Sequence, residues 1–235
     1  MMKVATAALV AALMIALAGC TVAVSGRPVA SAPTTLTPAP TSTAPPDRTE
    51  LEAALLPRDT VQNESLVDPG SAVTGRLLIN CTAAFPADNR LGTAVQRWWD
   101  GDGGGTTRDF EAGDVTVRHV VATYDGLTGP QVVDQARTVV GTSCRTYVSR
   151  SGSTWQLDRE VPASWPGVTS WGYCLQVVAP AERYGYVCTS YAARGDVISQ
   201  LTVSVTETQR DPTKATTSKL FDDLAARAAS RLPTS

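Results

Sequence analysis

The chain has 235 residues, of which 43% are hydrophobic and 18% are charged, and its formal net charge is −2. This composition is typical of a globular protein with one modest core. The Lys and Arg residues form no cluster of the kind that nucleic-acid binding needs, so we expect no nucleic-acid partner.

The N-terminal segment has the pattern of a bacterial lipoprotein signal. Residues 1–19 carry one Lys near the start, continue as an apolar run and end in Leu17-Ala18-Gly19, directly before Cys20. The run is short for a bilayer span, which needs about 20 apolar residues, and suits a signal peptide. We therefore expect cleavage before Cys20 and a diacylglycerol on its sulfur. A further N-acyl chain such as palmitate is expected, because one acyl chain alone holds a protein at a membrane only marginally.

This interpretation places the protein outside the cytoplasm, on the outer face of the cell membrane, with the membrane as its first partner. Ordinary secretory cleavage and a retained membrane anchor are the alternatives. Residues 20–47, which include the lipidated cysteine, are rich in Pro, Ser, Thr and Ala and hold almost nothing to bury. Such a composition predicts a disordered stalk, and residues 48–235 then form the folded domain.

The first half of the domain predicts a short helix and several strands. Residues 47–56 have an acidic first turn and stop at Pro57, as a short helix does. Residues 63–75 are polar and predict a loop, and residues 75–81 predict a strand. Residues 92–99 fit a strand or a short helix. Residues 115–124 are rich in β-branched side chains and predict a strong strand.

The second half predicts a helix, a run of strands and a terminal helix. Thr128 can cap a helix whose apolar stripe ends at Gly141, and residues 154–157 predict a strand. Trp155, Trp165 and Trp171 indicate an irregular aromatic connection. The remaining predicted elements are strands at 173–178, 184–192 and 197–206 and a helix at 211–232. Antiparallel strands with helices set apart define an α+β fold with two main packed helices.

Five cysteines fit this interpretation once lipidation uses Cys20. The other four, Cys81, Cys144, Cys174 and Cys188, allow three pairings, and an oxidising compartment favours disulfides. A turn at residues 180–183 would bring Cys174 to Cys188, which leaves Cys81 for Cys144. We expect no metal site, since no cysteines are spaced Cys-x-x-Cys and the one histidine, His119, lacks ligand-like neighbours.

The order of these features resembles the PknH-like extracytoplasmic sensor domain, which also occurs in free-standing actinobacterial lipoproteins. The resemblance covers roughly residues 49–233. It rests on Leu55-Leu56 in the first helix, Cys81 after the first strand, the strand at 115–124 and the helix ending in Gly141-Thr142-Ser143-Cys144, followed by residues 186–194 and the Ala-rich terminal helix. It implies a curved antiparallel sheet, a helix-lined cleft, the same two disulfides and ligand sensing without catalysis.

Residue patterns for metal binding or catalysis are weak. Asp100, Asp102 and Glu111 with Gly105 have part of the spacing of a calcium loop, but a strand follows instead of a helix, and we prefer a loop tip. Strand alternation puts His119 on the face of Val117 and Val121, where a half-buried structural histidine is expected. The chain has no Gly-x-Ser-x-Gly elbow and no Gly-rich phosphate or cofactor motif, so we expect no catalytic residue and no cofactor.

Tryptophans are the remaining candidates for a ligand site. Trp98, Trp99, Trp155, Trp165 and Trp171 suit a core first, but Trp155, Trp165 and Trp171 could line a cleft for an apolar or carbohydrate-bearing ligand. We expect a lipid-anchored envelope protein with a non-catalytic ligand-binding or sensor-like domain. A structural or protein-interaction lipoprotein is the alternative, and a hydrolase is less favoured.

Overall fold

The structure is a computed structural model that describes residues 45–61, 65–73, 81, 83–101, 114–162, 164–179, 184–207 and 210–234. The chain divides into two units, Met1–Ser42 and Thr43–Ser235. The first unit, with the predicted signal, Cys20 and most of the predicted stalk, lies outside the described residues. Those residues include no helix that is both long and apolar enough to cross a bilayer.

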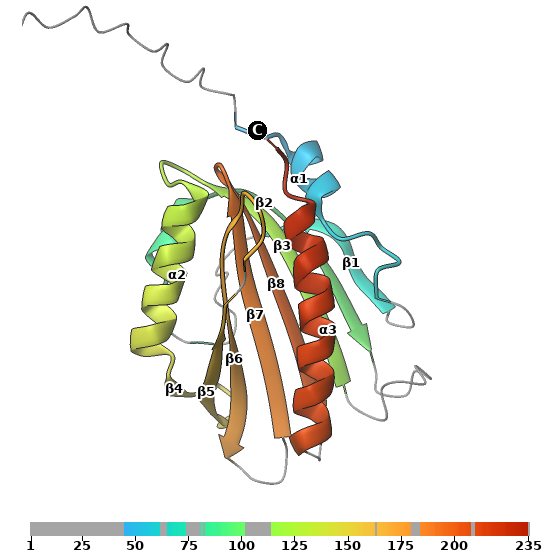
Figure 1. The fold of residues 1–235 in the computed structure, drawn as a ribbon, viewed down its shortest axis with the longest axis vertical. Coiled ribbons are helices and arrows are strands. Elements are labelled where there is room, and N and C mark those ends of the chain that lie inside the picture. The colour runs from blue at the N-terminus through green and yellow to red at the C-terminus, as the bar shows by residue number, and fades with distance from the viewer. Residues whose placement is uncertain are drawn as a thin grey trace, which may run out of the picture. The chain divides into compact units, whose positions relative to one another are not determined.

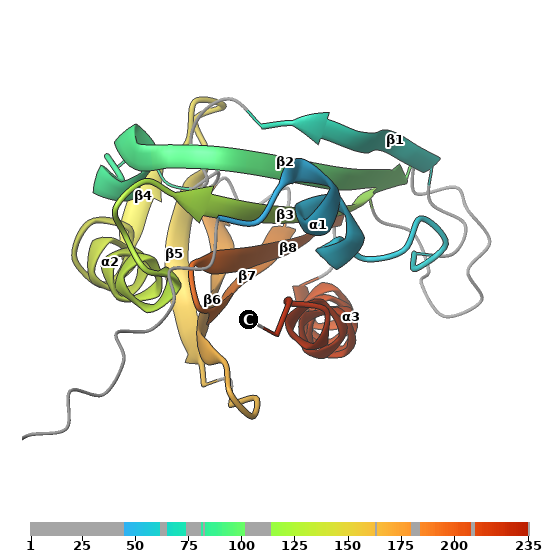
Figure 2. The same cartoon turned by 90° about the horizontal axis from the view of Figure 1, so that it is seen from above.

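One eight-stranded antiparallel sheet organises the domain (Figure 1). Its spatial order is β1-β2-β3-β8-β7-β6-β5-β4, so β3 and β8 join an N-terminal group of strands to a C-terminal one. Seen from above, the sheet does not lie flat but curves (Figure 2). The strands are β1 (Ser65–Ala72), β2 (Leu91–Gly101), β3 (Asp114–Tyr124), β4 (Thr146–Val148), β5 (Thr154–Val161), β6 (Thr169–Ala179), β7 (Tyr184–Arg194) and β8 (Val197–Glu207).

Helices cover the two faces of this sheet unequally. On one face, α1 (Arg48–Ala54) and the long α3 (Arg210–Ser230) pack on alternate residues of β2, β3, β7 and β8. On the other face, α2 (Gly129–Ser143) packs its stripe of Val132, Val133, Ala136 and Val140 on β6, β7 and β8. A short 3-10 helix, η1 (Pro86–Arg90), lies at the start of β2.

Local sequence explains where the helices begin. Asp47 and Glu50 form a capping box at α1, and Thr128 and Gln131 form one at α2, so each satisfies otherwise unpaired backbone N–H groups. Pro130 stands in the first turn of α2, where its missing N–H costs nothing. These signals confirm α1 and α2 as predicted. The terminal helix α3 and the α+β class with a curved antiparallel sheet are confirmed as well.

Several predicted boundaries were wrong. Residues 63–75 were expected to be a loop, but β1 forms there as an edge strand in irregular register with β2. The ambiguous segment at 92–99 is strand β2. Gly141 does not end α2, which continues to Ser143. Trp171 lies in strand β6 and not in an irregular connection, whereas the strand predicted at 154–157, with Trp155, is confirmed as part of β5. The strand predicted at 75–81 falls almost wholly outside the described residues.

Candidate functional site

The four domain cysteines form the two expected disulfides. Cys81 bonds to Cys144 and ties the segment before η1 to the end of α2, and Cys174 bonds to Cys188 across β6 and β7. All four side chains are buried. The pairing predicted from the turn and from the resemblance is confirmed. Lipidation of Cys20 stays a prediction.

The structure places two of the three tryptophans proposed to line a cleft, Trp155 and Trp171, on the α2 face, but it does not bring them together, since Trp155 pairs with Val177, six residues along β6 from Trp171. Trp171 is buried on the α2 face, where its ring stacks on Tyr173 at 5.2 Å and on Tyr191 at 6.2 Å. Trp155 packs against the same core. Trp165 lies in the β5–β6 connection and packs with the core of α1 and α3. A ligand role for these residues stays a prediction.

A polar surface that the sequence analysis missed occupies half of the α2 face. At one end of β3 and β8, the residues Val120, Ala122 and Ile198 on that face are buried in the cluster that includes α2 and η1. At the other end of the same strands, the side chains on that face are polar or aromatic and half-buried or exposed. We call this surface the polar face, and it consists of Gln96, Trp98 and Asp100 on β2, Thr116 and Arg118 on β3, and Ser204 and Thr206 on β8.

Strand register makes the polar face continuous. Trp98 stands directly opposite Arg118, Asp100 opposite Thr116, and Thr116 opposite Ser204. The Thr116 hydroxyl donates to the Asp100 carboxylate at 3.1 Å, and Arg118 Nε donates to Gln96 Oε1 at 2.8 Å. Trp98 keeps 37% of its surface exposed, which makes it one of the few exposed large hydrophobic side chains among the described residues.

Hydroxyl groups continue from the polar face into the interior. Arg118 pairs with Thr202, Thr202 with Thr189, and Thr189 with Tyr173, so a polar row crosses β3, β8, β7 and β6. The Thr189 and Thr202 hydroxyls lie 3.2 Å apart and are buried. Burial raises the pKa of Tyr173 to about 12, although hydrogen bonds with Thr189 and Tyr191 oppose that rise. The buried end of the row is therefore uncharged.

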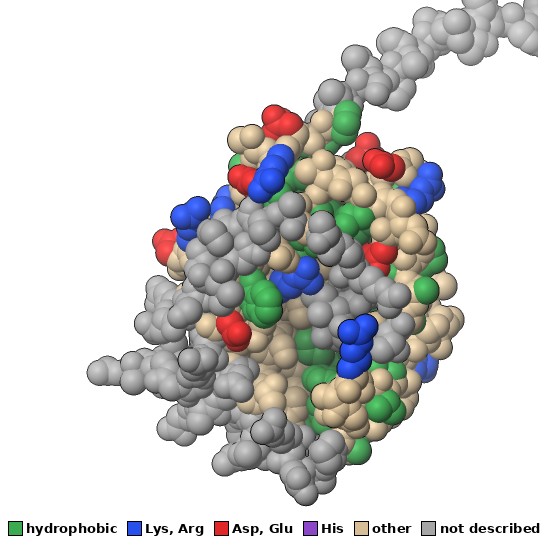
Figure 3. Space-filling view, turned by 180° about the vertical axis from the view of Figure 1, so that it is seen from behind, with side chains coloured by type: hydrophobic (Ala, Val, Ile, Leu, Met, Phe, Trp, Pro, Cys, Tyr) green, Lys and Arg blue, Asp and Glu red, His purple; other side chains and the backbone are tan. Residues whose placement is uncertain are grey.

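The surface of the molecule is hollowed on the side opposite the view of Figure 1. Figure 3 shows a basic, an acidic and a large hydrophobic side chain at the border of this hollow, whose visible floor consists mainly of neutral polar side chains and backbone.

His119 lies on the opposite face of β3 and is fully buried. Its Nδ1 accepts the Leu56 N–H at 2.9 Å, and its Nε2 lies 2.8 Å from the Ser199 hydroxyl. Burial, followed by the nearby charges of Arg231 and Arg97, lowers the pKa of His119 to about 3, so the ring stays neutral. The histidine is structural, as predicted, but more deeply buried than expected.

Side chains from β2 and from Arg231, directly after α3, hold the backbone around Leu56. Arg97 donates to the Leu56 carbonyl, Trp99 Nε1 donates to the Arg58 carbonyl at 3.0 Å, and Arg231 donates to the carbonyls of Leu55 and Ala53. Arg231 thus satisfies carbonyl groups that α1 leaves at its end, and Arg97 and Trp99 satisfy carbonyl groups of the segment that follows. The segment after α1 is therefore fixed to the sheet and to α3.

A pocket of about 210 Å³ lies between α3 and the sheet. Trp165 and Phe221 give it an aromatic wall, and Gly172 and Ser190 form a directly opposed pair of β6 and β7 at its base. Its other lining residues are Val161, Pro162, Ser164, Asp222 and Ala225. This pocket contains the one predicted tryptophan, Trp165, that does not pack on the α2 side.

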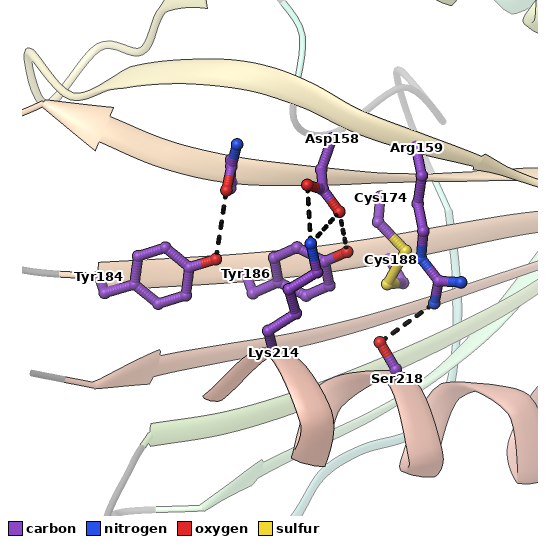
Figure 4. A network of polar contacts seen from close by, with 9 residues as sticks. Asp158, Arg159, Cys174, Tyr184, Tyr186, Cys188, Lys214 and Ser218 are labelled. Carbon is purple, nitrogen blue, oxygen red and sulfur yellow. Dashed lines mark hydrogen bonds and ion pairs between the residues drawn. A yellow bond between two sulfur atoms is a disulfide. The ribbon is translucent and has the colours of Figure 1, made fainter. Parts of the chain in front are cut away.

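A polar network lies next to the Cys174–Cys188 disulfide (Figure 4). Asp158 accepts the Tyr186 hydroxyl at 2.6 Å and pairs with Lys214 of α3 at 2.7 Å. Burial opposes ionisation of Asp158, but the hydrogen bonds from Lys214 and Tyr186 outweigh burial and hold the pKa of Asp158 below its usual value. Arg159 donates to Ser218 of α3 at 3.1 Å. The network therefore fastens α3 to β5 and β7.

The described residues contain no group of three or more His, Cys, Asp and Glu side chains that could hold a metal ion. Asp100 of the calcium-loop pattern lies on β2, and most of that pattern falls outside the described residues. Because the domain cysteines are in disulfides and both His119 nitrogens are engaged, neither residue type supplies a nucleophile or a general base in this part of the chain.

A sequence signal for the polar face was present. Residues 115–118 and 201–206 alternate apolar and polar side chains, which is the pattern of a strand with one face buried. The sequence shows that alternation, but it does not show which half of a face α2 leaves uncovered.

Comparisons with known proteins give a match to a solved structure. No family model and no curated protein matches the chain. The chain is similar to the crystal structure of the extracellular domain of PknH from Mycobacterium tuberculosis, with 14% sequence identity and a TM-score of 0.43, over 77% of this chain and 98% of that chain. At this identity and TM-score the match does not assign the chain to a family.

Proposed function

We propose that the protein is a lipid-anchored, extracytoplasmic binding protein whose domain recognises a ligand on the polar face without catalysing a reaction. The observation that carries the proposal is the placement of a half-exposed tryptophan, an arginine, a carboxylate and several hydroxyls on the half of the α2 face that the described helices leave open.

Two buried disulfides support the location outside the cytoplasm, since such bonds persist in oxidising compartments. The lipoprotein signal before Cys20 supports the anchor. The anchor is tested by the Cys20→Ala variant. The wild-type protein should partition into detergent and carry a diacylglycerol on its N-terminal peptide, whereas Cys20→Ala should do neither. A wild-type N-terminus with an unmodified Cys20 would contradict the anchor.

The binding function is tested with the full-length protein purified from its own host and examined by native mass spectrometry for a bound compound. Ser204→Trp adds a large side chain to the polar face, and Ser151→Trp adds the same side chain at an exposed loop tip. We expect a bound compound in the wild type and in Ser151→Trp and its loss in Ser204→Trp. A compound retained equally by both variants, or no compound in any preparation, would contradict the function proposed for this face.

A further inference from the structure

We infer that the polar face binds a neutral saccharide of at least two sugar units, with Trp98 as the platform on which one sugar ring stacks. This inference rests on the proposed function and adds the chemical class of the ligand.

The first argument concerns charge. The polar face carries one cation, Arg118, and one carboxylate, Asp100, two residues apart along the register of the β2–β3 pair. An anionic ligand attracted by Arg118 would be repelled by Asp100, and an organic cation would meet the opposite arrangement. The other polar members, Gln96, Thr116, Ser204 and Thr206, are neutral. A neutral ligand with many hydrogen-bonding groups therefore matches this surface best.

The second argument concerns the shape of the side chains. The negative face of an aromatic ring attracts the weakly positive C–H groups that a pyranose presents on one side of its ring. Trp98 is 37% exposed, and its register partner on β3 is Arg118, whose guanidinium donates to Gln96. Planar groups such as a guanidinium, a carboxylate and an amide can bind two neighbouring hydroxyls at once. An aromatic platform bordered by Arg118, Gln96 and Asp100 thus presents both kinds of contact that a sugar ring uses.

The third argument concerns size. Neighbouring strands are about 4.8 Å apart, so the polar face extends about 10 Å from β2 across β3 to β8. Along β2, the four steps from Gln96 to Asp100 add about 13 Å. This area exceeds one sugar ring and accommodates roughly two or three. The hydroxyl side chains Thr116, Ser204 and Thr206 would contact the unit next to the one stacked on Trp98, so a disaccharide should bind more tightly than a monosaccharide.

Isothermal titration calorimetry tests this inference with the full-length protein in a detergent that has no sugar headgroup. The probes are glucose, galactose, mannose and arabinose, their neutral di- and tetrasaccharides, and uronic-acid and amino-sugar counterparts. We expect neutral disaccharides to bind about tenfold more tightly than the monosaccharides, and the charged counterparts to bind more weakly. Trp98→Ala should weaken binding of the neutral disaccharide about tenfold, and Trp98→Phe should weaken it less.

Val148→Ala is the matched control, because Val148 is an exposed large hydrophobic side chain on β4, away from the polar face. It should bind saccharides as the wild type does. Should Trp98→Ala fail to fold, the affinities of Trp98→Phe and Arg118→Lys for the neutral disaccharide are compared with that of Val148→Ala. Both should bind it more weakly than Val148→Ala does. Binding that is unchanged in the Trp98 variants overturns the inference, and so does the absence of binding by every neutral saccharide. If native mass spectrometry finds a bound compound that is not a saccharide and that Ser204→Trp displaces, the inference about the ligand class is wrong, while the proposed binding function is supported.

Discussion

The buried neutral His119 makes the stability of the domain depend on pH, and this dependence can be predicted in sign and size. The pKa of His119 is about 3 in the folded protein against a reference of 6.5. Because the folded-state value is lowered, the unfolded chain takes up the proton first as the pH falls. The stabilisation is therefore complete above pH 6.5 and is lost as the pH falls toward 3. Between pH 7 and pH 4.5, protonation of His119 in the unfolded chain should lower the free energy of unfolding by about 2.5 kcal/mol.

Urea-induced unfolding at pH 7 and pH 4.5, with the disulfides intact, measures this loss. Carboxylates also titrate in this range, so the informative quantity is the difference between the wild type and His119→Asn. The Asn side-chain oxygen can replace Nδ1 as acceptor for the Leu56 N–H but has no proton to gain. The variant should be less stable at pH 7 by about 1–3 kcal/mol, because the hydrogen bond to Ser199 is lost or weakened.

Between the two pH values, the variant should lose about 2.5 kcal/mol less free energy of unfolding than the wild type. Equal losses in the two proteins would refute the reasoning, because they would mean that His119 is not buried as a neutral ring in the folded state.

Three further predictions concern stability. Replacing Cys81 and Cys144 together by Ala should lower the free energy of unfolding by about 4 kcal/mol, and replacing Cys174 and Cys188 together should lower it by about 3 kcal/mol. The first effect is larger because the Cys81–Cys144 bond closes the longer loop. A larger loss of thermal stability in the Cys174 and Cys188 variant would contradict this prediction. Asp158→Asn should cost about 1–2 kcal/mol at pH 7, and its effect in denaturant unfolding should disappear as the pH falls through the lowered pKa of Asp158, since the carboxylate of the wild type is then protonated. Gly129→Ala should destabilise the domain by about 1–3 kcal/mol, because a Cβ there would lie 2.7 Å from the Ala193 Cβ and 2.8 Å from the Gly195 carbonyl oxygen. Gly141→Ala is the matched control in the same helix. A Cβ at Gly141 would meet nothing within 4 Å, so this variant should raise the melting temperature.

Elements with a strong local pattern were predicted from the sequence, and elements fixed by their neighbours were not. Strand β3 and helix α2 carry their periodicity and caps within their own residues. Strand β1 contains Asp68-Pro69-Gly70, which locally predict a turn. It forms a strand because β2 offers it an edge, where the missing N–H of a proline is tolerated and register can shift.

The same distinction applies to the candidate site. The disulfides could be predicted because cysteines have few possible partners. The hydrogen bonds that hold the Leu56 backbone join residues 41 and 63 positions apart, and no local pattern signals such contacts. The polar face combines residues of β2, β3 and β8, which become neighbours only when the last strand pairs with the third. Its alternation was readable from the sequence, but its continuity across three strands was not.

The attachment of α1 also determines from which direction the domain can be approached. Leu51 and Ala54 pack with Val95, Val121 and Leu232, so the chain enters and leaves the domain at one end of the strands (Figure 1). The polar face lies at the other end of those strands, around Asp100 and Thr116. The segment that leads into α1 therefore lies away from the polar face, and a bulky partner at that face would not collide with the first residues of the domain.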